Sequence, residues 1–279
     1  MLDHRSLVQS AYELEPLPQS LTRLAALVAH GAPDPEEIAE CLAFDPVITA
    51  KVLRAANSTY SAPSRPVTRT RDAVLRLGPG AVFCLAVGIC ARPLMDRDIP
   101  GYGLTRGDLW RHSVRAALAA EAATDLCAAP IPRETFTAAM LHDLGKLVVG
   151  RFLTTDERDL LRRAVEESGA EDAEAESEIL SLHHGEVGAV IAQHWRLPDG
   201  IVQGILHHHD PAKGEQAVCY ATYLADVAAK TVEAGEPLPE RARRHLGAAM
   251  ERLRLNPAGF DAVCAKVAAD FDRMNARYN

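Results

Sequence analysis

The chain has 279 residues, of which 48% are hydrophobic and 24% charged, and its formal net charge is −8. This composition is ordinary for a globular protein, and the length allows one large or two small domains, each with a sizeable core. The negative charge argues against general binding to the phosphate backbone of nucleic acids.

One part of the chain has the opposite charge balance. Residues 51–76 contain one acidic side chain, Asp72, among the basic side chains Lys51, Arg54, Arg65, Arg69, Arg71 and Arg76, whereas residues 156–178 are strongly acidic. We favour a solvated helix face as the explanation of the basic stretch. The alternative is that the basic stretch and the polar cluster Asn57-Ser58-Thr59-Tyr60 together form a surface that helps to bind a ligand.

The cysteines and the N-terminus indicate a cytoplasmic protein. The cysteines at 41, 84, 90, 127, 219 and 264 are scattered without a CxxC pair, which is typical of free thiols in a reducing compartment. The first ten residues lack the layout of a signal peptide. The longest apolar run, residues 81–91, is about half of the ~20 residues that span a bilayer. We therefore expect no membrane segment.

Apolar residues recur with helical spacing along most of the chain, and no stretch alternates convincingly as a strand. We therefore predict an all-α fold. The expected helices cover residues 20–31, 34–44, 46–58, about 70–77 and 79–94, 108–126, about 133–150, 155–168, 175–181, 184–194, 198–206, 215–233, 238–253 and 257–276.

Local signals mark several helix boundaries. Ser20 would cap the first helix, which would end at Gly31. Asp34 and Asp45 would cap the next two helices, and each is followed by a proline in the first turn. Gly78, before a further proline, would separate two more helices.

A linker rich in Gly and Pro near residue 100 indicates the main division of the chain. We predict an N-terminal helical lobe over residues 1–100 and a helical core over 101–234. Residues 235–279 would form C-terminal helices that pack on this core.

Histidine and aspartate side chains occupy apolar-patterned segments after residue 100. Any one of these histidines, taken singly, is usually a core or surface residue. Together they are the ligand set of divalent transition metals, and burying them unpaired would cost several kcal/mol. The group consists of His112, His142, Asp143, His184, His207, His208, His209 and Asp226.

Spacing refines this hypothesis. Neighbours on a helix point ~100° apart, so His142 and Asp143 would reach one ion only from the edge between them. Asp143 has two carboxylate oxygens and could bridge two ions. Asp108 lies four residues before His112 and is either an outer ligand or, with Thr105, part of a capping box, which we favour.

Six segments carry a further signal. In chain order they are "LRAANSTY", "AVLRLG", "LWRHSVRAA", "AAMLHDLGKLV", "HGEVGAVIAQHWRLPDGIVQGILHHHDP" and "ATYLADVAA". Together they resemble the HDOD family, the HD-related output domains of bacterial signalling, and the resemblance covers roughly residues 15 to 230. It implies an HD-like helical core preceded by an N-terminal helical lobe.

The order His, His-Asp and Asp is similar to the signature of HD-superfamily phosphohydrolases, among them the HD-GYP phosphodiesterases, which hydrolyse cyclic di-GMP. That resemblance implies two metal groups joined by Asp143, and it implies that Lys146 contacts a substrate phosphate. Catalysis would then depend on Lys146 and Asp143. The implied ligands are His112, His142, Asp143 and Asp226 for one ion, and Asp143, His184, His208 and His209 for a second.

The chain departs from the HD-GYP pattern after the histidine pair. "HHDPAKGEQ" contains no Gly-Tyr-Pro stretch and no glutamate directly after the histidines. The loop that holds cyclic di-GMP in those enzymes is therefore missing, and we expect cyclic di-GMP to be a poor substrate. Many HDOD members have lost metal ligands and are taken as non-catalytic signalling domains, whereas this chain retains the full set.

Two functions follow from the resemblance. The first is a regulatory domain of bacterial signal transduction with a retained metal site, whose partner is a signalling protein or a small phosphorylated ligand. The alternative is a metal-dependent phosphohydrolase or phosphodiesterase that acts on a nucleotide or cyclic nucleotide. In both, the cofactor is one or two divalent ions, and iron, manganese, zinc and nickel all suit these ligands.

Overall fold

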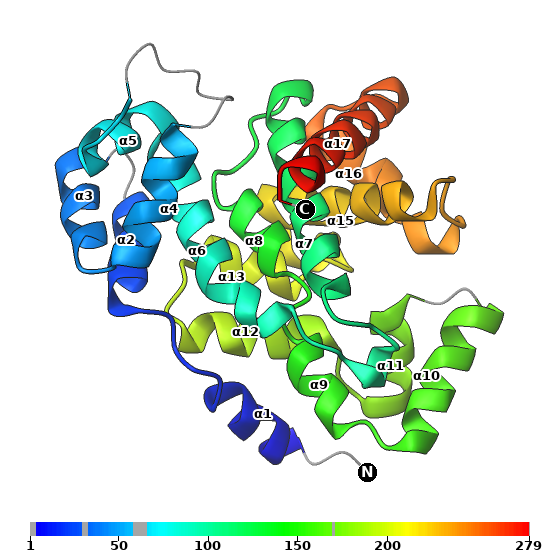
Figure 1. Cartoon of the computed structure of the whole chain (residues 1–279). Coiled ribbons are helices and arrows are strands. Elements are labelled where there is room, and N and C mark those ends of the chain that lie inside the picture. The colour runs from blue at the N-terminus through cyan, green and yellow to red at the C-terminus, as the bar shows by residue number, and fades with distance from the viewer. Residues whose placement is uncertain (1–3, 30–32, 58–65, 169–170, 279) are drawn as a thin grey trace. The chain divides into compact units, whose positions relative to one another are not determined.

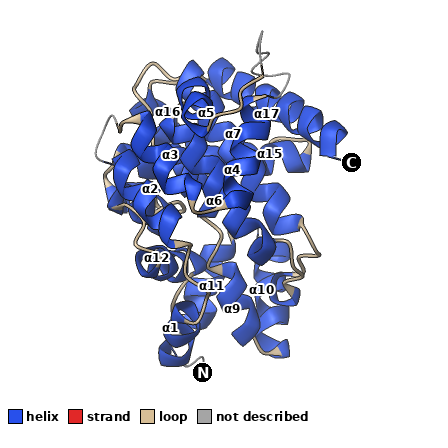
Figure 2. Ribbon diagram, turned by 60° about the vertical axis from the view of Figure 1, so that its left-hand side comes forward, coloured by secondary structure: helices blue, strands red, loops and turns tan. Residues whose placement is uncertain are grey.

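The protein is helical throughout the part of the chain that our computed structural model describes, which is residues 4–29, 33–57, 66–168 and 171–278. Figure 2 shows helices joined by loops, with no strand in these ranges. Within them, the one β-bridge pairs Ile99 with Leu104. The predicted all-α fold is confirmed.

The chain forms two compact units, which we call unit 1 and unit 2. Unit 1 comprises residues 1–14, 95–194 and 199–279, and unit 2 comprises residues 15–94 and 195–198. The domain boundaries that we placed near residues 100 and 235 stay predictions.

Unit 2 is built from short helices with defined ends. They are α2 (Gln19–Ala29), α3 (Pro35–Ala43), α4 (Pro46–Ala56), α5 (Thr70–Leu77) and α6 (Pro79–Met95), whose last residue belongs to unit 1 (Figure 1). The Asp34 carboxylate accepts a hydrogen bond from the Glu36 N–H at 2.9 Å, and the Asp45 carboxylate accepts from Val47 and Ile48 at 3.0 Å. Both predicted caps are confirmed. Gly78, with φ +83°, separates α5 from α6 as expected.

The start of α2 differs from the prediction. Ser20 lies inside the helix, because the Pro18 carbonyl already accepts from the N–H groups of Leu21 and Thr22 at 2.8 and 3.2 Å. Gly31, the expected end of this helix, lies outside the described residues.

Only part of the basic stretch can be placed, because Ser58, Thr59, Tyr60 and Arg65 lie outside the described residues. The Asn57 amide donates to the Val67 carbonyl and accepts from the Val67 N–H, both at 2.7 Å. This side chain therefore ties the end of α4 to the segment before α5.

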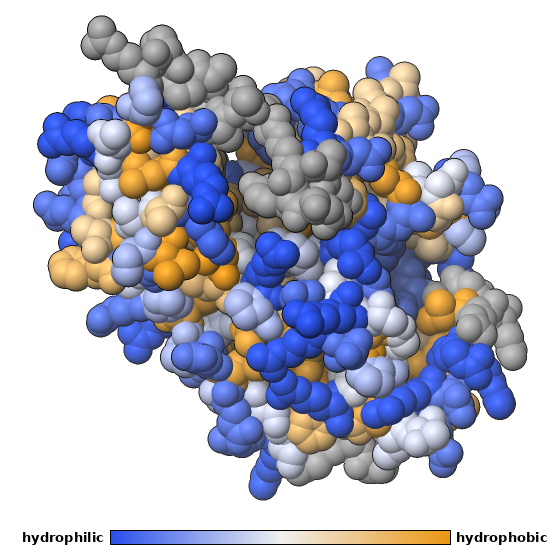
Figure 3. Space-filling view, in the orientation of Figure 1, coloured by the Kyte–Doolittle hydropathy of each residue, from blue (hydrophilic) through white to orange (hydrophobic). Residues whose placement is uncertain are grey.

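Hydrophobic residues lie at the surface of unit 2 among hydrophilic ones (Figure 3). The largest are Phe44, which is 84% exposed, Val47 and Leu75. Scattered apolar residues of this kind are usual on a protein surface. In the described residues no single helix is long and apolar enough to cross a membrane, although α5 and α6 would pass that test as a bent pair.

Unit 1 contains the remaining helices. They are α1 (His4–Tyr12), α7 (Asp108–Leu126), α8 (Thr135–Leu141), α9 (Lys146–Phe152), α10 (Thr155–Ser168), α11 (Asp172–Leu180), α12 (His184–His194), α13 (Asp199–Leu206), α14 (Pro211–Gly214), α15 (Ala217–Ala234), α16 (Leu246–Leu253) and α17 (Pro257–Tyr278), with 3-10 turns η1 (Pro100–Tyr102) and η2 (Arg241–Arg243). The sequence patterns did not predict α1 or α14.

The core of unit 1 is rich in alanine. Small side chains such as Ala116 and Ala120 of α7 and Ala225 and Ala228 of α15 are fully buried or nearly so, which lets these helices approach closely. Larger apolar residues of α16 and α17 fill the rest of this core. This packing fixes α7 and α15, which carry two of the predicted metal ligands, against each other.

The predicted helix over residues 133–150 is wrong in its middle. It breaks after Leu141 into a turn over residues 142–145, and α9 begins at Lys146. Hydrogen bonds from Leu144 to Leu141 and from Lys146 to Asp143 span three residues rather than four. The tighter winding accommodates α12, because the backbone of Gly145 packs directly on that of His184.

This contact makes Gly145 sensitive to substitution. A Cβ at position 145 would overlap the carbonyl oxygen of His184 and press on the Gly188 nitrogen, both of them backbone atoms, so backbone would have to shift. We expect Gly145→Ala to lower the free energy of unfolding by about 3 kcal/mol, the upper end for overpacking. Urea unfolding followed by circular dichroism measures this.

Gly247→Ala is the control, because Gly247 lies on α16 with open space around its Cα. Alanine there should be neutral or stabilise by up to about 1 kcal/mol. Equal stability of the two variants would contradict the close approach of the turn to α12.

Candidate metal centre

The structure brings all of the predicted metal ligands together in two adjoining groups of unit 1. In each group the potential ligand atoms lie within 4.8 Å of one another. The first group is His112, His142 and Asp226, and the second is Asp143, His184, His208 and His209. We call them group 1 and group 2.

Each group draws on segments that are distant in the sequence. His112 comes from α7, Asp226 from α15 and His184 from the first turn of α12, whereas His142 and Asp143 lie in the turn before α9. His208 and His209 follow the end of α13. The 142–145 turn therefore supplies one residue to each group.

Asp143 lies between the two groups and divides its oxygens between them. Its Oδ1 is 3.0 Å from His184 Nε2 and 3.9 Å from His208 Nε2. Its Oδ2 is 3.7 Å from His112 Nε2 and 3.6 Å from His142 Nε2. This is the arrangement that a bridging carboxylate requires.

Every imidazole of the two groups has its Nδ1 bound to an acceptor. His142 Nδ1 lies 2.7 Å from the Ala139 carbonyl oxygen, and His208 Nδ1 lies 2.6 Å from that of Ile205. A carbonyl oxygen only accepts, so Nδ1 carries the proton in both rings. Their Nε2 lone pairs then point into the centre, the tautomer that a metal needs.

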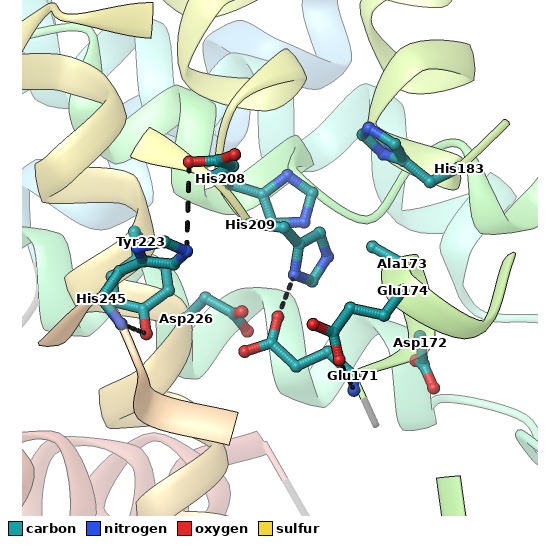
Figure 4. A network of polar contacts seen from close by, with 12 residues as sticks. Glu171, Asp172, Ala173, Glu174, His183, His208, His209, Tyr223, Asp226 and His245 are labelled. Carbon is teal, nitrogen blue, oxygen red and sulfur yellow. Dashed lines mark hydrogen bonds and ion pairs between the residues drawn. The ribbon is translucent and has the colours of Figure 1, made fainter. Parts of the chain in front are cut away.

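Glutamates play the same part for the other three imidazoles. Glu176 lies 2.8 Å from His184 Nδ1, Glu171 2.7 Å from His209 Nδ1, and Glu233 3.1 Å from His112 Nδ1. Figure 4 shows Glu171 directed at the His209 ring. Carboxylates in this position orient metal-binding imidazoles and increase their basicity.

The sequence patterns did not identify these glutamates. Glu171 and Glu176 belong to the acidic stretch 156–178, where nothing separates them from solvated neighbours, yet Glu176 is 0% exposed and Glu171 7%. Glu233 lies seven residues after Asp226, two turns along the same helix face. That spacing is the one signal that could have pointed to it.

Two lysines neutralise part of the carboxylate charge. Lys146 Nζ lies 3.0 Å from Asp143 Oδ2 and 2.7 Å from Asp172, and Lys230 Nζ lies 2.7 Å from Asp226 Oδ2. Asp226 thus keeps Oδ1 for group 1, at 3.1 Å from His112 Nε2. Lys230 is a further residue of the site that the sequence did not indicate.

The electrostatics keep the aspartates ionised. Burial alone would raise the pKa of Asp143, but the Lys146 ammonium and the nearby imidazoles hold it well below its usual range. Burial acts in the same direction on Asp226, and Lys230 and His112 hold its pKa well below the usual value. Both carboxylates are therefore available as anionic ligands.

Four of the histidines fall into two classes. Burial lowers the pKa of His112 and His184, but their carboxylate partners outweigh it and raise each to about 9. Burial and neighbouring imidazoles instead hold the pKa of His208 and His209 well below the usual range. Of these four imidazoles, a cation would have to displace protons from His112 and His184.

The residues fit a pair of divalent transition metals. Imidazole nitrogen and carboxylate oxygen are their usual protein ligands, and here each imidazole is held in the required tautomer. The ligand side chains are also shielded from water, with His112 the most open at 12% exposure. Without a cation, the negative charges of Asp143 and Asp226 would be compensated by protonated imidazoles and the two lysines.

Other candidates lie outside the two groups. The Asp108 carboxylate accepts from the Thr105 N–H at 2.7 Å and from its hydroxyl at 2.6 Å, which is the Asp108 half of the favoured capping box, whereas α7 itself begins at Asp108 with Gly107 as its N-cap. His207, the remaining histidine of the predicted set, is only half-buried and belongs to neither group.

Comparison with known proteins gives the family. The model of the HDOD domain matches residues 14–211. No curated protein matches the chain.

Similar solved structures include an HDOD domain protein with unknown function from Geobacter sulfurreducens, 24% identical, with TM-score 0.69 and coverage of 97% of this chain and 98% of that one. A proposed phosphohydrolase from Shewanella amazonensis SB2B is 24% identical, with TM-score 0.67, and the match covers 95% of this chain and 93% of that one. A proposed signal transduction protein from Marinobacter aquaeolei VT8 is 21% identical, with TM-score 0.71, and the match covers 97% of this chain and 65% of that one.

At these identities the likeness establishes a shared fold and nothing about activity. The family match spans more than half of the chain and includes most of the two ligand groups. The chain belongs to the HDOD family, and it carries a buried His/Asp cluster of the HD type that could hold metal.

Proposed function

We propose that the protein is a regulatory domain of bacterial signalling whose metal centre stabilises and sets the conformation of unit 1. The observation that carries this proposal is the burial of the ligands. His142, His184 and His208 are 0% exposed, Asp226 is 2% and Asp143 is 3%. Structural zinc sites fill four coordination positions with protein ligands, whereas catalytic sites keep a position open to water or substrate. With Asp143 shared, each group offers four such side chains.

Within the proposed centre, groups 1 and 2 would each hold one divalent ion, and Asp143 would be a ligand available to both. Iron, manganese, zinc and nickel are all compatible with these ligands. Bound cations supply positive charge that compensates the buried carboxylates. Lys146 and Lys230 keep the carboxylates of Asp143 and Asp226 oriented, and Glu171, Glu176 and Glu233 keep three of the imidazoles oriented.

The partner that we propose is another signalling protein, and a small phosphorylated ligand is the alternative. Unit 2 supports the first choice, because Val47, Lys51 and Arg54 share one exposed face of α4 and Phe44 lies exposed just before it. Apolar and basic side chains together suit an acidic protein surface. The resemblance of the fold to a proposed signal transduction protein also agrees with this role.

A second candidate function is metal-dependent hydrolysis of a phosphoester. It is favoured by the division of Asp143 oxygens between the two groups, since two-metal hydrolases use such a bridge. Lys146, 3.0 Å from Asp143, would offset charge on a phosphate. A panel of nucleotides and cyclic nucleotides separates the proposals: turnover by loaded protein that Asp143→Ala abolishes would establish the hydrolase and contradict a closed structural centre.

The ligand assignment predicts distinct metal contents for single variants. We expect Asp143→Ala to lose both ions, because it removes the shared ligand, and His208→Ala to lose the ion of group 2. His207→Ala, the adjacent half-buried histidine, should retain the wild-type content and serves as the matched control. Elemental analysis by mass spectrometry of protein purified without chelators gives these contents. Full metal content in Asp143→Ala would rule out the bridge.

Metal binding should release protons at neutral pH. Because His112 and His184 have pKa values of about 9, both rings are charged at pH 7.5 in the absence of metal, and a cation at Nε2 must displace those protons. We expect the release of about two protons on full loading at pH 7.5, falling towards zero by about pH 10, so affinity weakens as the pH falls below 9.

Calorimetric titrations in buffers of different ionisation enthalpy measure this release. His112→Ala should reduce the release by about one proton, whereas His207→Ala should leave it unchanged. A heat of binding that is independent of the buffer at pH 7.5 would mean that these imidazoles are already neutral.

A further inference from the structure

Helix α11 is held largely by its acidic side chains. The apolar residues that it buries are two alanines, Ala173 and Ala175, and Leu180. Alanine buries little apolar area, so the hydrophobic contribution to docking this helix is small. Its carboxylates, together with that of the capping residue Glu171, make specific contacts instead.

One face of α11 is attached to the metal centre. Asp172 and Glu176 lie four residues apart on that face. Asp172 contacts Lys146 at 2.7 Å, and Glu176 accepts from the His184 backbone N–H at 2.6 Å as well as from its ring. Glu171, just before the helix, contacts His209.

Another face of α11 is attached to the segment after α15. Glu174 points away from Asp172 and Glu176, and its carboxylate forms an ion pair with Arg241 at 3.1 Å and a second with Arg244. Figure 4 shows Glu174 beside Glu171, whose backbone N–H donates to the Glu174 carboxylate at 3.4 Å. The His245 backbone N–H in turn donates to the Tyr223 hydroxyl at 3.1 Å.

We infer that α11 relays the state of the metal centre to residues 238–246. The inference rests on the proposed metal binding. A cation on the Nε2 atom of His209 would fix the opposite Nδ1–H towards Glu171, the capping residue of α11, and a cation on His184 Nε2 would hold that ring in place against Glu176, which tightens the attachment of α11. Glu174 then presents its carboxylate to Arg241 and Arg244 in one fixed position, so that the loaded centre orders residues 238–246.

The relay has a physical consequence for signalling. Residues 238–246 contain exposed basic side chains, Arg241 and Arg244 among them, and they lead into α16. A change of metal state inside unit 1 would therefore alter a charged segment at its surface. A partner could read this segment without access to the buried centre.

Hydrogen–deuterium exchange on the full chain tests the relay. Zn²⁺-loaded and chelator-treated protein are compared after elemental analysis of both. We expect chelation to increase the exchange rate of α11 and of residues 238–246 about two- to fivefold, the range for loss of partly exposed ion pairs. Loss of protection in α11 alone would overturn the relay.

Glu174→Gln isolates the link. Glutamine preserves the N-terminal capping box of α11 but removes the ion pairs with Arg241 and Arg244. In loaded Glu174→Gln, residues 238–246 should exchange as fast as in chelated wild type while α11 stays protected. Glu178→Gln, an exposed position of the same helix with the same loss of charge, is the matched control and should behave as wild type.

The outcomes distinguish the two proposals. If the protein takes up Zn²⁺ but residues 238–246 exchange at the same rate before and after chelation, the relay is contradicted and the proposal of a metal centre still stands. Protein that takes up no Zn²⁺ contradicts the metal centre and the relay together. An equal effect of Glu174→Gln and Glu178→Gln would also overturn the relay, because it would show general loosening of α11.

Discussion

Two buried carboxylates, Asp143 and Asp226, impose the main constraint on unit 1. They are 3% and 2% exposed, and an ionised carboxylate in such surroundings must be compensated by positive charge and hydrogen bonds. Lys146 and Lys230 provide part of this compensation, and five imidazoles face the remaining oxygens. In our account divalent cations complete the charge compensation. The surrounding helices therefore bring their ligands to one place, around Asp143 and Asp226.

The architecture follows from bringing those ligands together. Alanine-rich faces let α7 and α15 approach, so that His112 and Asp226 come within 3.1 Å. The absence of a side chain at Gly145 lets the turn before α9 meet α12, which places Asp143 3.0 Å from His184. Small residues thus position the large polar ones, and the outer glutamates then fix the orientation of the rings.

The sequence pattern identified the candidate ligands because His and Asp side chains on apolar-patterned helices are costly unless they are used, and the resemblance to HD-superfamily enzymes implied their division into two groups. The break at residues 142–145 was not predictable, since residues 138–150 have continuous helical periodicity and the cause, contact of Gly145 with His184, is tertiary. Glu176 was missed because its acidic neighbours are solvated, and burial, which distinguishes it, is not a local property. Metal identity and partner depend on chemistry that side-chain pattern does not encode.

The most direct test of this account is the melting temperature of the protein with and without chelator, after elemental analysis has measured its metal. Metal that binds only the folded state stabilises it by about 2.7 kcal/mol at a hundredfold excess over its dissociation constant, which corresponds to about 5 °C for a chain of this size. We predict a loss of that size on chelation, reversed when metal is restored, retained in His207→Ala, reduced in His142→Ala, which keeps group 2, and abolished in Asp143→Ala. Equal melting temperatures with and without metal would show that the lysines and imidazoles alone compensate Asp143 and Asp226, and would contradict the account.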